Sequence, residues 1–207
     1  ISFTKADDIS DFEIEGISIG DSALDFFSKE QITKNTWDYP KKKFKRVQND
    51  KLSFFKIYDA VDFNFKTNDQ NYKIYNLSGI LFYDNKNIKE CYKKMDEIIA
   101  DIDDLFQDLK KSQKETYKHA ADKSGKSEIT DIEYEFDNGD TLTVMCYDYS
   151  KDHGSQDHLA LSLSTKEYRE WIPTAYDWLD IKIAKLSISF IIWISKLFMI
   201  SIKSWLT

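Results

Sequence analysis

The chain has 207 residues, of which 42% are hydrophobic and 15% aromatic, enough for a domain with a buried core rather than a disordered body. The formal charge is −7, and the only charged residues of 181–207 are four lysines, so residues 1–180 carry −11. A surface this acidic repels phosphates, and we expect no nucleic-acid partner.

The first six residues resemble the end of a secretory signal peptide. Small residues, Thr4 and Ala6, stand at positions −3 and −1 of a cleavage point before Asp7. This pattern predicts that 1–6 is a signal-peptide remnant and that the protein is periplasmic or secreted. An even number of cysteines, Cys91 and Cys146, agrees with export.

Next comes the tetrapeptide Gly-Asp-Ser-Ala, which resembles the nucleophile motif of Gly-Asp-Ser-Leu hydrolases at Ser22. Those hydrolases also need an Asn-Asp block and an Asp-x-x-His pair, and neither accompanies it here. A side-chain oxygen of Asp21 or Ser22 can instead accept hydrogen bonds from the first amides of a helix over 23–32. We therefore predict a helix cap, and we assign no catalytic residue.

Alternating apolar residues then predict strands near 44–47, 53–65 and 72–83. The clearest element is a helix over 88–109, because its apolar residues recur every three or four positions and include Cys91. Asn87 and Glu90 predict a capping box at its start. We expect residues 112–127 to form a polar loop.

A β-hairpin is predicted over 129–149. A two-residue turn at Asn138-Gly139 would pair Phe136 with Thr141, whereas a three-residue loop at 137–139 pairs Tyr134 with Leu142. Matching of the apolar faces favours the three-residue loop and places Cys146 in the core. Cys91 and Cys146 then face one core, and two interpretations remain: a disulfide bond or two buried thiols.

The loop after the hairpin, "DYSKDHGSQDH", is rich in groups that can bind metals. Its weak candidate ligands are His153, His158, Asp152 and Asp157. Their spacing is irregular, and a polar loop between two strands has the same composition. A strand at 159–163 and a helix beginning near Ser164 follow, and Pro173 predicts a kink or a new helix.

The elements predict one α+β domain over 7–180, with possible halves 7–84 and 85–180. We expect an antiparallel β-sheet with helices packed on one face, possibly an α-β-β-β unit used twice. Residues 181–207 are apolar and basic. Three interpretations remain for them: a helix in contact with a membrane surface, an ordinary packed helix, or a frameshift tail.

Three stretches, "ADDISDFEIEGISIGDSALDFFSKEQI", "YKHAADKSGKS" and "STKEYREWI", resemble a group of uncharacterised exported proteins of A/T-rich marine bacteria. The resemblance spans about residues 6–176 and implies export and a compact domain, without an activity. Together with the missing catalytic motif, it favours a non-enzymatic domain that binds a protein or an envelope component and needs no cofactor. The alternative is a metal-assisted enzyme that uses the loop 148–158.

Overall fold

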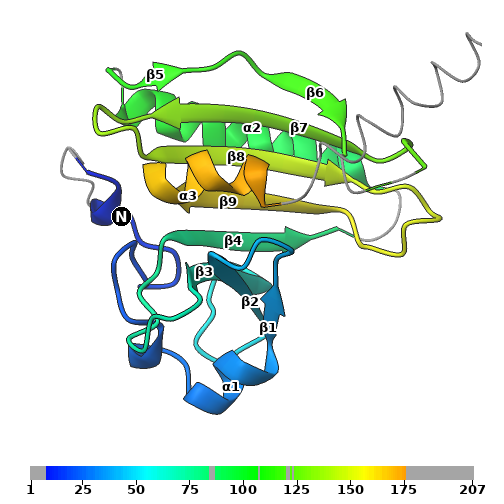
Figure 1. Ribbon diagram of the computed structural model, residues 1–207. Helices are drawn as coiled ribbons and strands as arrows, with labels where there is room; N and C mark the ends of the chain where they lie inside the picture. The colour runs from blue at the N-terminus through cyan, green and yellow to red at the C-terminus, as the bar shows by residue number, and fades with distance from the viewer. Residues whose placement is uncertain (1–7, 84–86, 107, 120–121, 123, 176–207) are drawn as a thin grey trace, which may run out of the picture.

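The computed structural model of the protein describes residues 8–83, 87–106, 108–119, 122 and 124–175 (Figure 1). The predicted signal-peptide remnant at 1–6 and the apolar segment 181–207 lie outside these residues. Within the described residues, no helix is both long and apolar enough to cross a membrane.

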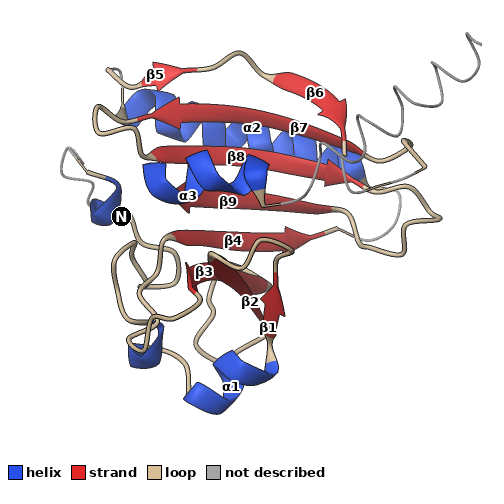
Figure 2. Ribbon diagram, viewed as in Figure 1, coloured by secondary structure: helices blue, strands red, loops and turns tan. Residues whose placement is uncertain are grey.

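The strands form one antiparallel sheet of nine strands, which confirms the predicted α+β class (Figure 2). The strand order is β1-β2-β3-β4-β9-β8-β7-β5, and β6 also pairs with β7. The strands are β1 (Thr36–Asp38), β2 (Phe44–Asp50), β3 (Ala60–Lys66), β4 (Asn76–Phe82), β5 (Lys110–Lys111), β6 (Glu115–Lys118), β7 (Glu128–Glu135), β8 (Thr141–Asp148) and β9 (His158–Ser164).

The element order differs from a repeated α-β-β-β unit. Helix α1 (Lys29–Lys34) precedes four strands, and helix α2 (Ile88–Leu105) precedes five. Strands β1, β5 and β6 were missed because they have only two to four residues and no apolar alternation, so the loop expected at 112–127 contains β6. The last strand before α2, β4, pairs with the last strand of the sheet, β9, and this pairing joins the two sets of strands into one sheet.

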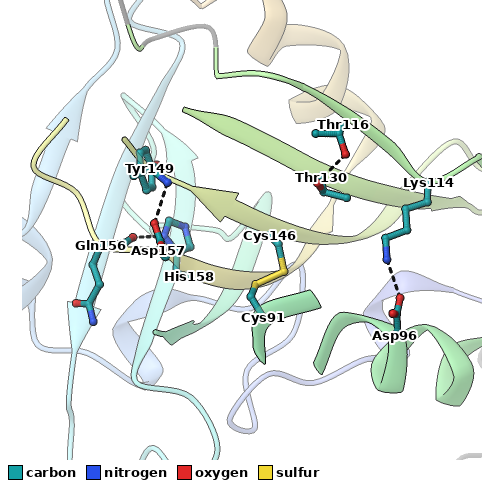
Figure 3. The surroundings of a disulfide bond; sticks show 10 residues. All are labelled: Cys91, Asp96, Lys114, Thr116, Thr130, Cys146, Tyr149, Gln156, Asp157 and His158. Carbon is teal, nitrogen blue, oxygen red and sulfur yellow. Dashed lines mark hydrogen bonds and ion pairs between the residues drawn. A yellow bond between two sulfur atoms is a disulfide. The ribbon is translucent and has the colours of Figure 1, made fainter. Parts of the chain in front are cut away.

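One face of the sheet, which we call the back face, is covered by α2. Cys91, Met95 and Ile102 are buried there, and a disulfide joins Cys91 to Cys146 of β8 (Figure 3). The structure thereby decides between the two interpretations of the cysteines. Helix α2 ends at Leu105 rather than at 109, and Asn87 makes no side-chain capping bond to the helix residues that the structure describes, so the predicted capping box is wrong.

The opposite face, the front face, carries helix α3 (Lys166–Trp171), so the prediction that all helices pack on one face is wrong (Figure 1). The reason is a second apolar cluster on this face, formed by Phe44 and Tyr39 with Tyr168 and Trp171 of α3. Aromatic side chains at one end of the front face would otherwise be exposed to solvent, and the short amphipathic helix α3 buries them.

Two local predictions are confirmed. The side chain of Ser22 accepts a hydrogen bond from Leu24 N, so it caps a short 3-10 helix, Ala23–Asp25, and it also donates to the carbonyl of Asn71. The helix expected over 23–32 is interrupted, because α1 begins after a second cap at Ser28. The hairpin has the three-residue loop, with Tyr134 opposite Leu142 and with Gly139 at a φ of 85°.

Candidate functional site

The front face is polar across six neighbouring strands. Two consecutive cross-strand rows from β2 to β7 contain no apolar residue, as is common on the face of an antiparallel sheet that lies away from the main core. One row is Gln48, Asp62, Ser78, Ser162, Thr143 and Glu133, and the other is Arg46, Asn64, Asn76, Ser164, Thr141 and Glu135.

The middle of these rows is a buried hydrogen-bond network. Asn76 is its hub, because its Nδ2 donates to Asn64 Oδ1 at 3.0 Å and its Oδ1 accepts from Ser162 and Ser164. The Oγ atoms of Ser162 and Ser78 lie 2.8 Å apart. Asn64 also donates to the Tyr39 hydroxyl, 3.0 Å away, which ties the network to the apolar cluster under α3. A network satisfied in this way fixes the positions of the strands.

Beside this network lies an ion pair between β2 and β3. The guanidinium Nε of Arg46 donates to Asp62 Oδ2, and Arg46 Nη2 donates to Gln48 at 3.1 Å. Asp62 is only 6% exposed, and its Oδ1 has no hydrogen-bond partner among the described residues. Burial raises the pKa of the Asp62 carboxyl, and the nearby Arg46 charge opposes that rise. A buried acceptor left unsatisfied is unusual, and it is a reason to look for a bound donor.

At the other end of the front face, stacked rings from β8, β9 and the loop between them form what we call the aromatic ladder: Tyr147, Tyr149, His153 and His158. The rings of Tyr147 and His158 stack with centroids 4.4 Å apart, and those of Tyr149 and His153 with centroids 4.7 Å apart. Tyr147 and Tyr149 are nearly parallel, at 13°. His119 contacts the ladder through Tyr149, so all three histidines of the chain gather here.

The surroundings of the ladder disfavour the charged forms of its side chains. Burial lowers the pKa of His158 to about 4, and the charge of Arg46 acts in the same direction. His158 Nδ1 lies 3.1 Å from the carbonyl oxygen of Gln156, which can only accept (Figure 3). Nδ1 therefore carries the proton of the neutral ring, and Nε2 is an acceptor. Burial also lowers the pKa of His119 and raises that of Tyr147.

The sheet brings the ion pair and the ladder toward each other. Strands β1–β3 run at a steep angle to the strands beyond β4, so the sheet curls toward its front face (Figure 1). Consistent with this curl, burial raises the pKa of Tyr147 on β8, and the charge of Arg46 on β2, four strands along the sheet, opposes that rise. One curled surface therefore carries a cation, an unsatisfied carboxylate oxygen and aromatic hydroxyl groups.

The four candidate metal ligands each have another role in the structure. Asp152 forms a salt bridge with Lys126 at 2.8 Å, and Asp157 Oδ1 accepts from the backbone of Tyr149 at 2.8 Å (Figure 3). His153 and His158 stack on tyrosines. In the part of the chain that the structure describes, no group of three or more His, Cys, Asp or Glu side chains could hold a metal ion.

Sequence reasoning pointed to the loop but missed Arg46, Asp62 and the two tyrosines of the ladder. Arg46 stands in the basic run 41–46, which the sequence suggests is solvated. One signal in the sequence could have pointed to the polar network. In β3 and β4, polar residues recur at every other position: Asp62, Asn64, Asn76 and Ser78. All four are buried, which marks a polar network rather than a solvated face.

Comparisons with models of protein families, with curated proteins and with solved structures found no match. The class of the protein is therefore defined by its fold: an α+β domain with a disulfide and a curled antiparallel sheet.

Proposed function

We propose that the protein is an exported, non-enzymatic binding domain and that its ligand contacts the front face. The observation that carries the proposal is the unsatisfied, buried Oδ1 of Asp62 beside Arg46, on a face where the neighbouring polar side chains are otherwise hydrogen-bonded to one another. Burying such an oxygen costs free energy unless a donor reaches it, and a bound ligand or an ordered water supplies one.

Export is supported by the Cys91–Cys146 disulfide, since disulfides persist in oxidising compartments. The sequence pattern before Asp7 and the resemblance to exported proteins agree with it. The test is thiol labelling of the protein recovered from the cells that make it, followed by intact mass measurement. We expect no label before reduction and two labels after it, on a chain that begins at Asp7. Free thiols, or a chain that retains residues upstream of Asp7, would contradict export.

Binding at the front face can be located by hydrogen–deuterium exchange. The full-length protein is incubated with a detergent-free extract of the cell envelope, and exchange is compared with the protein alone. We expect slower exchange in β2, β3, β8 and β9. The variant Tyr147→Ala should reduce this protection, whereas Lys94→Ala on the exposed side of α2 is the matched control and should keep it. Protection confined to α2, or none, would overturn the proposal.

The alternative function, a metal-assisted enzyme that uses the loop 148–158, is tested with the same protein and added Zn²⁺. The arrangement of the loop favours the binding domain, because Asp152 is already paired with Lys126 and Asp157 with the backbone of Tyr149. A melting temperature that rises with Zn²⁺ in the wild type but not in the double variant His153→Ala, His158→Ala would favour the enzyme.

A further inference from the structure

The strongest accessible feature of the front face is at its β1 edge. Trp37 is 70% exposed, the largest exposed fraction among the large hydrophobic side chains of the described residues. It lies opposite Arg46 in the β1–β2 register, so the two side chains are neighbours on the front face. The side chain of Arg46 is itself 43% exposed. An indole and a guanidinium are therefore both open to a ligand at one position.

The polar groups around Trp37 are held in place by their own hydrogen bonds. Arg46 Nη2 donates to Gln48 Oε1, and Gln48 Nε2 donates to Asp50 Oδ1 at 2.9 Å. A guanidinium has five N–H donors, so Arg46 retains donors after these contacts and the bond to Asp62. We call Trp37, Arg46 and Gln48 the Trp37 patch. It combines one flat aromatic ring with rigid planar groups that donate and accept hydrogen bonds.

The charges beside the indole are already compensated. Asp62 forms an ion pair with Arg46, and Asp38 Oδ1 lies 3.4 Å from Lys45 Nζ. An anionic or cationic ligand would find little uncompensated charge to attract it, whereas a neutral ligand with many hydroxyl groups can use both the donors of Arg46 and the amide of Gln48. The C–H groups on one side of a sugar ring carry partial positive charge, which the negative face of an indole attracts.

Two other occupants fit less well. Strand β1 is at the edge of the sheet, but its three residues offer too short a row of backbone groups for an added peptide strand. A second copy of the chain needs about 800 Å² of interface on each partner. One tryptophan among charged and polar neighbours does not supply an apolar surface of that size.

We propose that the Trp37 patch binds a neutral sugar unit of a glycan, stacked on the indole and hydrogen-bonded to Arg46 and Gln48. The inference rests on the proposed function, because it names the ligand class for the front face. The sugar lies at the β1 edge of the front face, where the side chains are exposed. The aromatic ladder lies at another part of the same face.

The experiment is a glycan array with neutral and acidic oligosaccharides, followed by calorimetric titration of the best neutral glycan into the wild type and each variant, with tryptophan fluorescence as a second readout. We expect binding to neutral glycans and a blue shift of the emission. Trp37→Phe should retain binding but lose the shift. Trp37→Ala should weaken binding about fivefold, since an aromatic contact contributes about 1 kcal/mol and 1.4 kcal/mol corresponds to a factor of ten. Ile57→Ala, at another residue that is 63% exposed, is the matched control and should bind normally.

The outcomes separate this inference from the proposed function. Binding only to acidic glycans, binding that Trp37→Ala does not weaken, or no glycan binding overturns the sugar assignment. Self-association that depends on Trp37 and replaces glycan binding overturns it as well. If the envelope extract still slows exchange of the front face in these cases, the proposed function stands and only the ligand class is wrong. If neither the extract nor any glycan binds, both proposals fail.

Discussion

Tyr147 and His158 face each other across β8 and β9 with their rings stacked, and the charge of Arg46, on β2 of the same front face, acts to lower the pKa of both. Burial keeps His158 neutral, because a charged imidazole in this half-buried position loses solvation and meets the positive guanidinium of Arg46. This relationship gives the first prediction.

We predict that the protein loses stability as the pH falls from about 6.5 to about 4. The pKa of His158 is lowered to about 4 in the folded chain, so over this interval the unfolded chain binds the proton more readily and the free energy of unfolding falls. The contribution of His158 is fully present above pH 6.5 and amounts to about 3 kcal/mol, at about 1.4 kcal/mol for each pH unit between the two pKa values.

The measurement is urea unfolding of the wild type and His158→Phe at several pH values. Phenylalanine retains a ring next to Tyr147 but cannot be protonated. Asp62 and Asp131 have raised pKa values and favour the opposite trend, so the quantity that matters is the difference between the two proteins. Equal slopes for both would show that His158 does not carry the effect.

A second prediction concerns the Cys91–Cys146 disulfide, which closes a loop with a sequence separation of 55 residues. Loop-closure entropy assigns such a link about 4 kcal/mol of stability. The double variant Cys91→Ala, Cys146→Ala should lose about this amount in chemical denaturation, and reduction of the wild type should give a similar loss. A loss below about 1 kcal/mol would mean that α2 holds its place on the back face by packing alone.

The third prediction concerns the hub of the polar network. Asn76→Ala leaves Asn64 Oδ1 without its donor and the Ser164 hydroxyl without its acceptor, and it leaves Ser162 with only Ser78 as a partner. We expect a loss of about 3 kcal/mol, since each buried unsatisfied group costs about 1–3 kcal/mol. Ser164→Ala removes one partner of the hub and should cost about 1 kcal/mol. If both variants unfold at the same urea concentration, the network is not cooperative.

The fourth prediction concerns the approach of Tyr58 to β4. A Cβ added at Gly79 would lie 2.6 Å from a carbon of the Tyr58 ring. Gly79→Ala should therefore destabilise the protein by about 1–3 kcal/mol, because the half-buried ring must move. In a Tyr58→Ala background the same substitution should cost much less, and a double-mutant cycle measures this coupling. Equal costs in both backgrounds would show that the ring is not the obstacle.

The sequence by itself determined the local elements of the protein. The periodicity of α2 and the cap at Ser22 depend on neighbouring residues, and the register at Tyr134 and Leu142 follows from the apolar alternation and the loop at Gly139. Each of these features depends on residues within about 20 positions of one another. Over that distance the spacing of apolar side chains follows the period of the helix or strand. The α+β class could be predicted from the sequence for the same reason.

Only the tertiary structure decided the disulfide, the second covered face and the candidate site. Alternation along a strand tells which residues share a face, but it does not tell which strands are neighbours. The pairing of β4 with β9 and the curl of the sheet bring Arg46 and Asp62 toward Tyr147 and His158, which lie far apart in the chain. The site is therefore a product of strand order and sheet twist, which a single sequence does not record.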